Sequence, residues 1–81
     1  MISEKIFLEL IGDITYKSEV RLETPFLKLA IDSLKYMRII VAMEKQYRIR
    51  FDETDLDIHR FALIGDMWNY IVMKTRDSAN S

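Results

Sequence analysis

Apolar residues recur at helical spacing in three stretches of the chain, and this pattern constrains the fold more than any other feature. The stretches cover roughly residues 3–14, residues 33–47 and residues 63–74. In each, apolar side chains fall three or four positions apart, which is the spacing of one face of an α-helix. Helix-breaking residues are few: the chain contains only Gly12, Gly65 and Pro25. The pattern therefore favours helices over many short strands.

The second stretch is the clearest helix. Its predicted core stripe consists of Tyr36, Ile39, Ile40, Met43 and Tyr47. Ser3 is a plausible N-cap for the first helix, and Asp32 or Ser33 for the second, because side-chain oxygens satisfy the free amides of a first turn. A short third helix is expected in the acidic run around Leu56 and Ile58. That run contains Asp52, Glu53, Asp55 and Asp57.

These elements predict an all-α fold, a small four-helix bundle with three longer helices and one short helix. A long loop over residues 15–32 joins the first two helices. Its apolar residues are expected to pack on the core: Phe26, Leu27, Leu29 and Ile31. Loops of this length are uncommon in compact domains and tend to be functional or partly structured. We predict one domain over residues 1–75 and a disordered polar tail over residues 76–81.

Composition excludes several kinds of function. The chain has no cysteine and a single histidine, His59, so we expect no disulfide, no thiolate chemistry and no metal site. Its net charge of −1 argues against nucleic-acid binding, which needs a basic excess. No apolar stretch is long enough to span a membrane, and the N-terminus lacks a secretory signal. These features favour the cytoplasm.

Several motifs have plain structural explanations. The alternating acidic residues from Asp52 to Asp57 resemble a calcium loop, but the central glycine and the final glutamate are missing. We expect His59 at the surface or at a helix end. Phe61, Trp68 and Tyr70 are predicted to be core or rim aromatics. Phe7, Phe26 and Tyr36 are candidates to line a space between helices. We expect no catalytic residue.

The run Ile31-Asp32-Ser33-Leu34 places a hydroxyl at the first turn of the second helix, where it should be exposed to solvent. Several further segments follow Ser33 at the distances that one known protein family shows. They are the second helix, the aromatic Tyr47, the short acidic segment, Phe61, the run Ile64-Gly65-Asp66 and the pair Tyr70-Ile71. This arrangement resembles the acyl carrier protein family over nearly the whole chain. A simple N-cap serine is the alternative explanation for Ser33.

The resemblance implies that Ser33 carries 4′-phosphopantetheine, derived from coenzyme A, and that its thiol holds acyl groups as thioesters. It also implies that Asp32 and Leu34 help the modifying enzyme to recognise the site. The implied partners are a phosphopantetheinyl transferase, an enzyme that loads acyl or aminoacyl groups, and downstream synthases. The chain itself would be a monomeric, non-catalytic carrier. An aminoacyl, peptidyl or D-alanyl carrier is the alternative within this class.

Three departures from the family pattern are informative. Ala30 stands where the family often has glycine, and we expect a different turn there that avoids a positive φ angle. Asp52 replaces a common proline, which should loosen that boundary. The second helix and its end carry Lys35, Arg38, Lys45 and Arg48 against Glu44 alone, whereas carriers of bacterial fatty acid synthesis are strongly acidic. Enzymes that dock through basic patches would be repelled.

A second apolar face on this helix suggests a docking surface. Leu34, Met37 and Val41 lie beside the core stripe and are flanked by Lys35, Arg38 and Lys45. An apolar patch with a charged border suits transient partners, although burial under the long loop is the alternative. We therefore expect a carrier in a specialised pathway, such as polyketide or mixed peptide–polyketide biosynthesis. Other classes left open are a helical interaction module without a prosthetic group and, less compatible with the charge, a helix-turn-helix DNA binder.

Overall fold

The structure, a computed structural model, describes residues 2–79, with side chains up to residue 77. Over this range the chain forms three α-helices and two short 3₁₀ helices. In chain order they are α1 (Glu4–Thr15), η1 (Phe26–Leu29), α2 (Ser33–Tyr47), η2 (Glu53–Asp55) and α3 (Ile64–Ala79). The all-α fold is confirmed, and η2 is the short third helix predicted from the acidic run.

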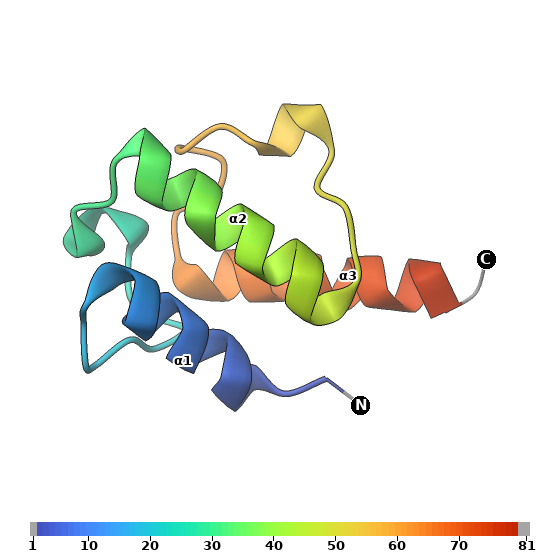
Figure 1. Ribbon diagram of the computed structural model, residues 1–81, viewed down its shortest axis with the longest axis horizontal. Helices are drawn as coiled ribbons and strands as arrows, with labels where there is room; N and C mark the ends of the chain where they lie inside the picture. Colours follow the sequence, from blue (N-terminus) through green and yellow to red (C-terminus); the bar gives the residue numbers. More distant parts are fainter. Residues whose placement is uncertain (1, 80–81) are drawn as a thin grey trace.

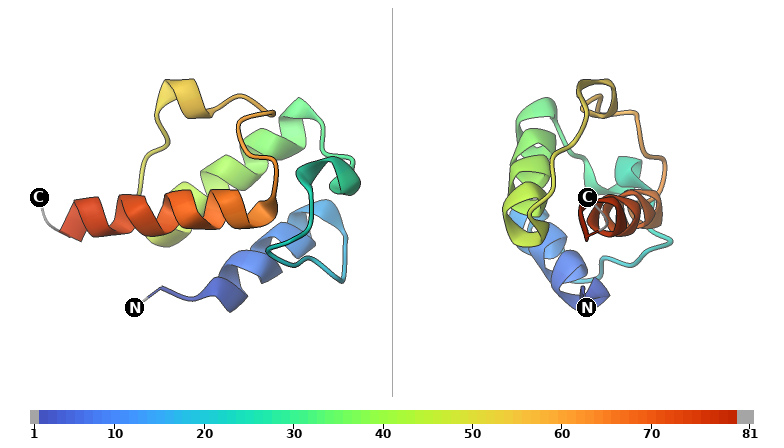
Figure 2. Two further views of the ribbon diagram at one scale, coloured as in Figure 1. Left: turned by 180° about the vertical axis from the view of Figure 1, so that it is seen from behind. Right: turned by 90° about the vertical axis from the view of Figure 1, so that its right-hand side faces the viewer.

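The three long helices pack around one core. Helices α1 and α2 lie side by side, and α3 covers the face behind them, so that the right-hand view of Figure 2 shows α3 end-on opposite the other two (Figures 1 and 2). The segment that contains η2 passes above α2 and α3 in the view of Figure 1. Core residues from all three helices and from both connections are buried: Phe7, Ile11, Phe26, Leu29, Tyr36, Ile39, Ile40, Met43, Ile49, Phe51, Phe61, Ile64, Met67, Tyr70 and Ile71.

The helices begin where the sequence predicts, whereas the last helix ends later than predicted. The Ser3 hydroxyl accepts a hydrogen bond from the Ile6 amide at 3.4 Å and caps α1. Helix α3 continues to Ala79, so its predicted end near Lys74 is wrong. No glycine or proline follows Gly65, so nothing in the sequence breaks the helix there. Residues 80 and 81 of the predicted disordered tail lie outside the described residues.

The long connection between α1 and α2 is held against the start of α3 by backbone hydrogen bonds. The Phe26 amide donates to the Ala62 carbonyl at 3.0 Å, and the Gly65 amide donates to the Leu22 carbonyl at 2.7 Å. A Cβ atom at Gly65 would lie 3.0 Å from that carbonyl oxygen, so glycine permits the close approach. Leu27 is 84 % exposed, so its predicted burial is wrong: it lies on the outward side of η1, while Phe26 and Leu29 pack inward.

Ala30 adopts the conformation that we expected the chain to avoid. It ends η1 with φ 49° and ψ 47°, in the left-handed region, and its amide donates to the Leu27 carbonyl at 3.4 Å. The tertiary position of η1 fixes this turn, and an alanine Cβ is strained in it. The turn immediately precedes Asp32 and Ser33, so it sets how the chain enters α2.

Ala30→Gly is therefore expected to stabilise the protein by about 0.5–1 kcal/mol, because glycine adopts positive φ angles without steric cost. Urea unfolding at pH 7 measures the change. The matched control is Ala42→Gly, which lies within the right-handed α2 and should destabilise by about 1 kcal/mol. Destabilisation by both substitutions would contradict the left-handed conformation at Ala30.

Candidate functional site

Ser33 is the first residue of α2, and its side chain is exposed. Asp32, one residue before it, is the N-cap: its carboxylate accepts a hydrogen bond from the Lys35 amide at 2.8 Å. Within residues 2–79 the Ser33 hydroxyl has no hydrogen-bond partner. The capping role that offered an alternative explanation for Ser33 thus belongs to Asp32, and the Ser33 hydroxyl is left free at the surface.

The backbone around Ser33 suits a phosphate group. The amides of Ser33 and Leu34 are in the first turn of α2, and among the described residues neither has an acceptor. The free amides and the positive end of the helix dipole stabilise an anion at this position. The Asp32 carboxylate opposes this locally, but it is committed to the Lys35 amide.

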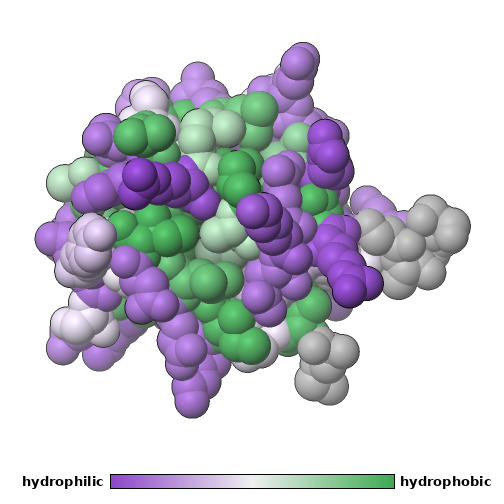
Figure 3. Space-filling model, viewed as in Figure 1, coloured by the Kyte–Doolittle hydropathy of each residue, from purple (hydrophilic) through white to green (hydrophobic). Residues whose placement is uncertain are grey.

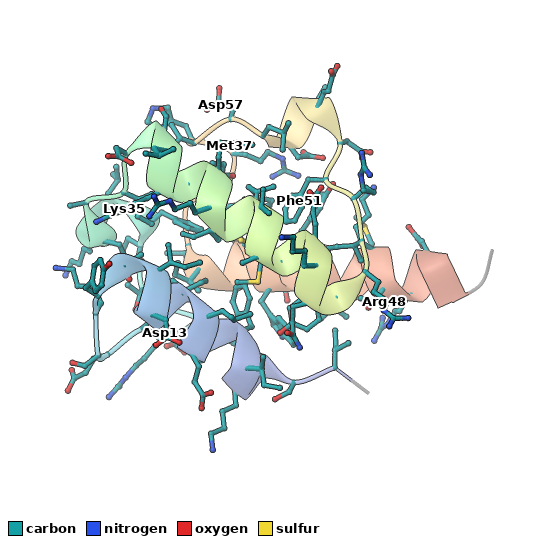
Figure 4. The ribbon with its side chains drawn as sticks, viewed as in Figure 1. Asp13, Lys35, Met37, Arg48, Phe51 and Asp57 are labelled. Carbon is teal, nitrogen blue, oxygen red and sulfur yellow. The ribbon has the colours of Figure 1, made fainter. Side chains whose placement is uncertain are left out.

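A groove of about 360 Å³ runs beside Ser33, between the start of α2 and the loop after η2. Its lining is Ser33, Tyr36, Met37, Leu56, Asp57, Ile58 and His59. Figure 4 shows Asp57 on that loop and Met37 on the side of α2 that is nearest to it. A smaller hollow of about 130 Å³ shares Ile58 and His59 and extends the space toward Phe26 and Ala30. Sequence reasoning did not find this groove, because its wall comes from a segment more than twenty residues away in the chain.

The loop that forms the wall is anchored at both ends. Arg60 Nε donates to Asp55 Oδ1 at 2.5 Å, and this hydrogen bond holds the pKa of Asp55 below its usual value. The Arg60 guanidinium also lies 4.7 Å from the centre of the Phe61 ring. Between these anchors, Asp57 Oδ1 accepts from the His59 amide at 2.7 Å. His59 is exposed, as predicted, although it lies on this loop and not at a helix end.

Asp52 anchors the beginning of the segment instead of loosening it. Its amide donates to the Tyr70 hydroxyl at 3.3 Å, and its carboxylate lies 3.0 Å from Lys74 Nζ. A proline at this position would have no amide to donate. The expectation of a loosened boundary is therefore wrong. Tyr70 and Phe61 are buried and Trp68 is half-buried, which confirms that they are core or rim aromatics.

The predicted second face of α2 is exposed. Leu34 is 66 % exposed, Val41 43 % and Met37 39 %, so burial under the long loop is excluded. Arg38 and Lys45 are also exposed, whereas Lys35 is half-buried with its Nζ 5.7 Å from the centre of the Tyr16 ring. Figure 3, which views the molecule from the α2 side, shows apolar groups bordered by long hydrophilic side chains.

Comparison of the chain with models of known protein families identifies its family. The family model described as the phosphopantetheine attachment site matches residues 5–67, from the first turn of α1 to the start of α3. The chain belongs to this family. No solved structure matches the chain significantly. Proteins of the family carry covalently attached 4′-phosphopantetheine, and their domains are generally non-catalytic carriers.

The phosphopantetheine carrier thus has features in its own structure that fit the prosthetic group. These are an exposed hydroxyl, open amides for a phosphate, and an adjoining groove lined in part by Tyr36, whose buried hydroxyl has no partner among the described residues. Sequence reasoning assigned Tyr36 to the core and did not see its unpaired hydroxyl. The only signal was a tyrosine in an apolar stripe, since a buried tyrosine hydroxyl usually needs a partner. No helix within residues 2–79 is long and apolar enough to cross a membrane.

Proposed function

We propose that Ser33 is the residue to which 4′-phosphopantetheine is attached, and that the protein carries acyl groups for separate enzymes without doing chemistry of its own. The observation that carries this proposal is the division of roles at the start of α2: Asp32 caps the helix and leaves the Ser33 hydroxyl exposed and unpaired. When bound, the group supplies a thiol that holds cargo as a thioester. Ser33 and Leu34 offer their free amides to its phosphate, and the groove beside them accepts the chain that follows.

Mass measurement tests this function. The purified protein is incubated with coenzyme A, Mg²⁺ and a promiscuous phosphopantetheinyl transferase, and its intact mass is then determined. A gain of one phosphopantetheine group per chain is expected. An unchanged mass with several different transferases would overturn the carrier function and would favour a helical interaction module.

The exposed face of α2 is proposed as the surface that meets the partner enzymes: the transferase, a loading enzyme and downstream synthases. It presents Leu34, Met37 and Val41 with cationic side chains around them. From Ser33 to Arg48 the chain has four cations (Lys35, Arg38, Lys45 and Arg48) and one anion, Glu44. Such a surface favours partners with acidic borders, because opposite charges steer association and like charges oppose it. This charge supports a specialised pathway, such as polyketide or mixed peptide–polyketide synthesis, over housekeeping fatty acid synthesis.

Reversing these charges is expected to convert the protein into a better substrate for enzymes with basic docking patches. The triple variant Lys35→Glu/Arg38→Glu/Lys45→Glu should raise kcat/KM with a bacterial fatty-acid malonyl transferase about tenfold or more at low salt. The gain should shrink at high ionic strength, because salt screens exposed charges. Malonyl transfer to the phosphopantetheine-loaded protein is the measurement.

The control variant changes the net charge by the same amount, but at exposed residues outside α2. Lys5→Glu/Lys17→Glu/Arg76→Glu replaces three exposed cations that lie off α2. If this variant gained as much as the α2 variant, net charge would explain the result and the docking surface would be wrong.

A further inference from the structure

The Tyr36 hydroxyl is a buried polar atom without a hydrogen-bond partner among the described residues. Tyr36 is only 1 % exposed, so water does not satisfy the hydroxyl from the surface. Leaving such a group unpaired costs the full desolvation penalty of the hydroxyl. Native structures contain few groups of this kind, and each one needs an explanation. A core role alone does not supply it, because phenylalanine would fill the same space without the cost.

The position of Tyr36 connects the hydroxyl to the carrier site. Tyr36 follows Ser33 by three residues, so the two side chains lie on the same face of α2. Both line the groove of about 360 Å³. The ring of Tyr36 meets the ring of Phe26 edge-on, with centroids 6.1 Å apart, and Phe26 lines the adjoining hollow. Tyr36 therefore lines the space nearest to Ser33, and its buried hydroxyl is close enough to Asp57, in the same lining, to be influenced by that charge.

The groups around the hydroxyl keep it protonated without binding it. Burial, followed by the negative charge of Asp57, raises the pKa of Tyr36 to about 12, against a smaller opposing effect of Arg60. Asp57 is in the groove wall, and Arg60 is held by Asp55 at the end of the same loop. At neutral pH the hydroxyl is therefore a neutral donor, and its natural complement is an acceptor oxygen.

We propose that the Tyr36 hydroxyl selects the cargo: it donates a hydrogen bond to an oxygen near the thioester end of the acyl group, and so favours 3-hydroxy or 3-oxo acyl groups over saturated chains of the same length. This inference rests on the proposed attachment at Ser33. Every acyl thioester has a carbonyl oxygen at its first carbon, so the proposed selection depends on the oxygen at the third carbon. A saturated chain has no acceptor at that carbon, whereas a 3-hydroxy or 3-oxo chain supplies one. Because the long arm separates Ser33 from the thioester, the contact requires the arm to fold back along α2, and the small volume of the groove then limits the contact to the first carbons of the cargo.

Cargo entry requires a small movement of the wall. The hydroxyl is buried in the structure, and the groove wall opposite α2 comes from the loop over residues 56–59. Leu56 and Ile58 are only half-buried, so an acyl chain that displaces them exchanges one apolar contact for another. The anchors at Asp55 and Arg60 lie outside the segment that has to move.

The test loads the protein with three groups and observes Tyr36 directly. A promiscuous transferase attaches phosphopantetheine from coenzyme A, from hexanoyl-coenzyme A or from 3-hydroxyhexanoyl-coenzyme A, and mass measurement confirms each product. The chain has four tyrosines, so ¹³C labelling of the phenol carbon gives a simple spectrum in which Tyr36→Phe identifies the Tyr36 signal. We expect that signal to move with the 3-hydroxyhexanoyl group and to stay in place with the hexanoyl group and with the bare arm.

Thermal unfolding gives the second readout. The 3-hydroxyhexanoyl form should melt about 4 °C or more above the hexanoyl form, since that is the shift a single regained hydrogen bond gives in a domain of this size. The difference should vanish in Tyr36→Phe, a variant that we expect to fold at least as well as the parent because it loses only an unpaired hydroxyl. Tyr47→Phe is the matched control: its hydroxyl donates to the Ser3 carbonyl at 3.0 Å, away from the groove, and it should keep the difference.

The possible outcomes distinguish failure of cargo selection by Tyr36 from failure of the proposed carrier function. Without a mass gain, the carrier function itself fails. With a mass gain, an equal movement of the Tyr36 signal in all three forms would show that an oxygen of the arm is the acceptor, and cargo selection by Tyr36 would be overturned. An equal movement in the two acylated forms alone would assign the contact to the thioester carbonyl, and cargo selection would again be overturned. It would be overturned equally if the signal moved in none of the forms, or if Tyr36→Phe kept the difference in melting temperature.

Discussion

Ser33→Ala is expected to abolish attachment of phosphopantetheine completely while leaving the fold intact. The variant removes the hydroxyl oxygen to which we propose that the group is attached. Its effect on stability should be within about 0.5 kcal/mol, which is usual for exposed positions that make no specific contact. The reason is that Asp32 caps α2 and the Ser33 hydroxyl has no partner among the described residues. Intact mass after treatment with coenzyme A and transferase measures attachment, and urea unfolding measures stability.

Two controls make this result specific. Ser18→Ala removes an exposed hydroxyl from the long connection and should leave the mass gain unchanged. Asp32→Ala should keep the attachment atom but lose the cap, which costs about 0.5–2 kcal/mol. It should also slow modification if Asp32 assists recognition. Full modification of Ser33→Ala would show that another side chain carries the group.

Alkaline pH is expected to destabilise the protein by an amount that depends strongly on Tyr36. Its pKa is raised to about 12 by burial and by Asp57, whereas a tyrosine in the unfolded chain titrates near 10. Between these values the unfolded chain loses the proton while the folded protein keeps it, so the free energy of unfolding falls as pH rises. The stability is fully present below pH ~10, and roughly 2 kcal/mol is lost by pH ~12.

Urea unfolding from pH 8 to 12 measures this loss, and the difference between variants isolates Tyr36. Tyr36→Phe should lose markedly less stability over this range, because only the other titrating groups remain. Those include Tyr47 and Tyr70, whose pKa values are also raised by burial. Tyr16→Phe, at an 85 % exposed ring, should behave as the parent. Equal losses in the parent and in Tyr36→Phe would mean that the hydroxyl is accessible to water in solution.

Features that depend on neighbours in the sequence were predicted well. The helical repeat located α1 and α2 to within a residue or two, and Ser3 and Asp32 cap them. The core stripe of α2 is buried at Tyr36, Ile39, Ile40 and Met43, while Tyr47 is half-buried because its hydroxyl reaches the Ser3 carbonyl. Capping and amphipathic patterning are local effects, so a single segment contains the information that they need.

Features that depend on distant segments were missed or predicted wrongly. Leu27 was expected to be buried in the core, but its side chain is exposed to solvent. The hydrogen bonds that join the connection to α3 determine which side of η1 faces the core. Ala30 was expected to avoid a positive φ angle, but the position of η1 imposes one. The groove beside Ser33 was not foreseen, because its second wall is the loop after η2.

The sequence by itself determined the helices, the composition of the core, the cationic face of α2 and the placement of Ser33 at the first turn of a helix. The tertiary structure alone decided that a groove adjoins Ser33, and that Tyr36, whose buried hydroxyl is unpaired among the described residues, lines it. The physical reason is that helical periodicity repeats within a few residues. Burial and hydrogen-bond satisfaction depend instead on which segments meet in space.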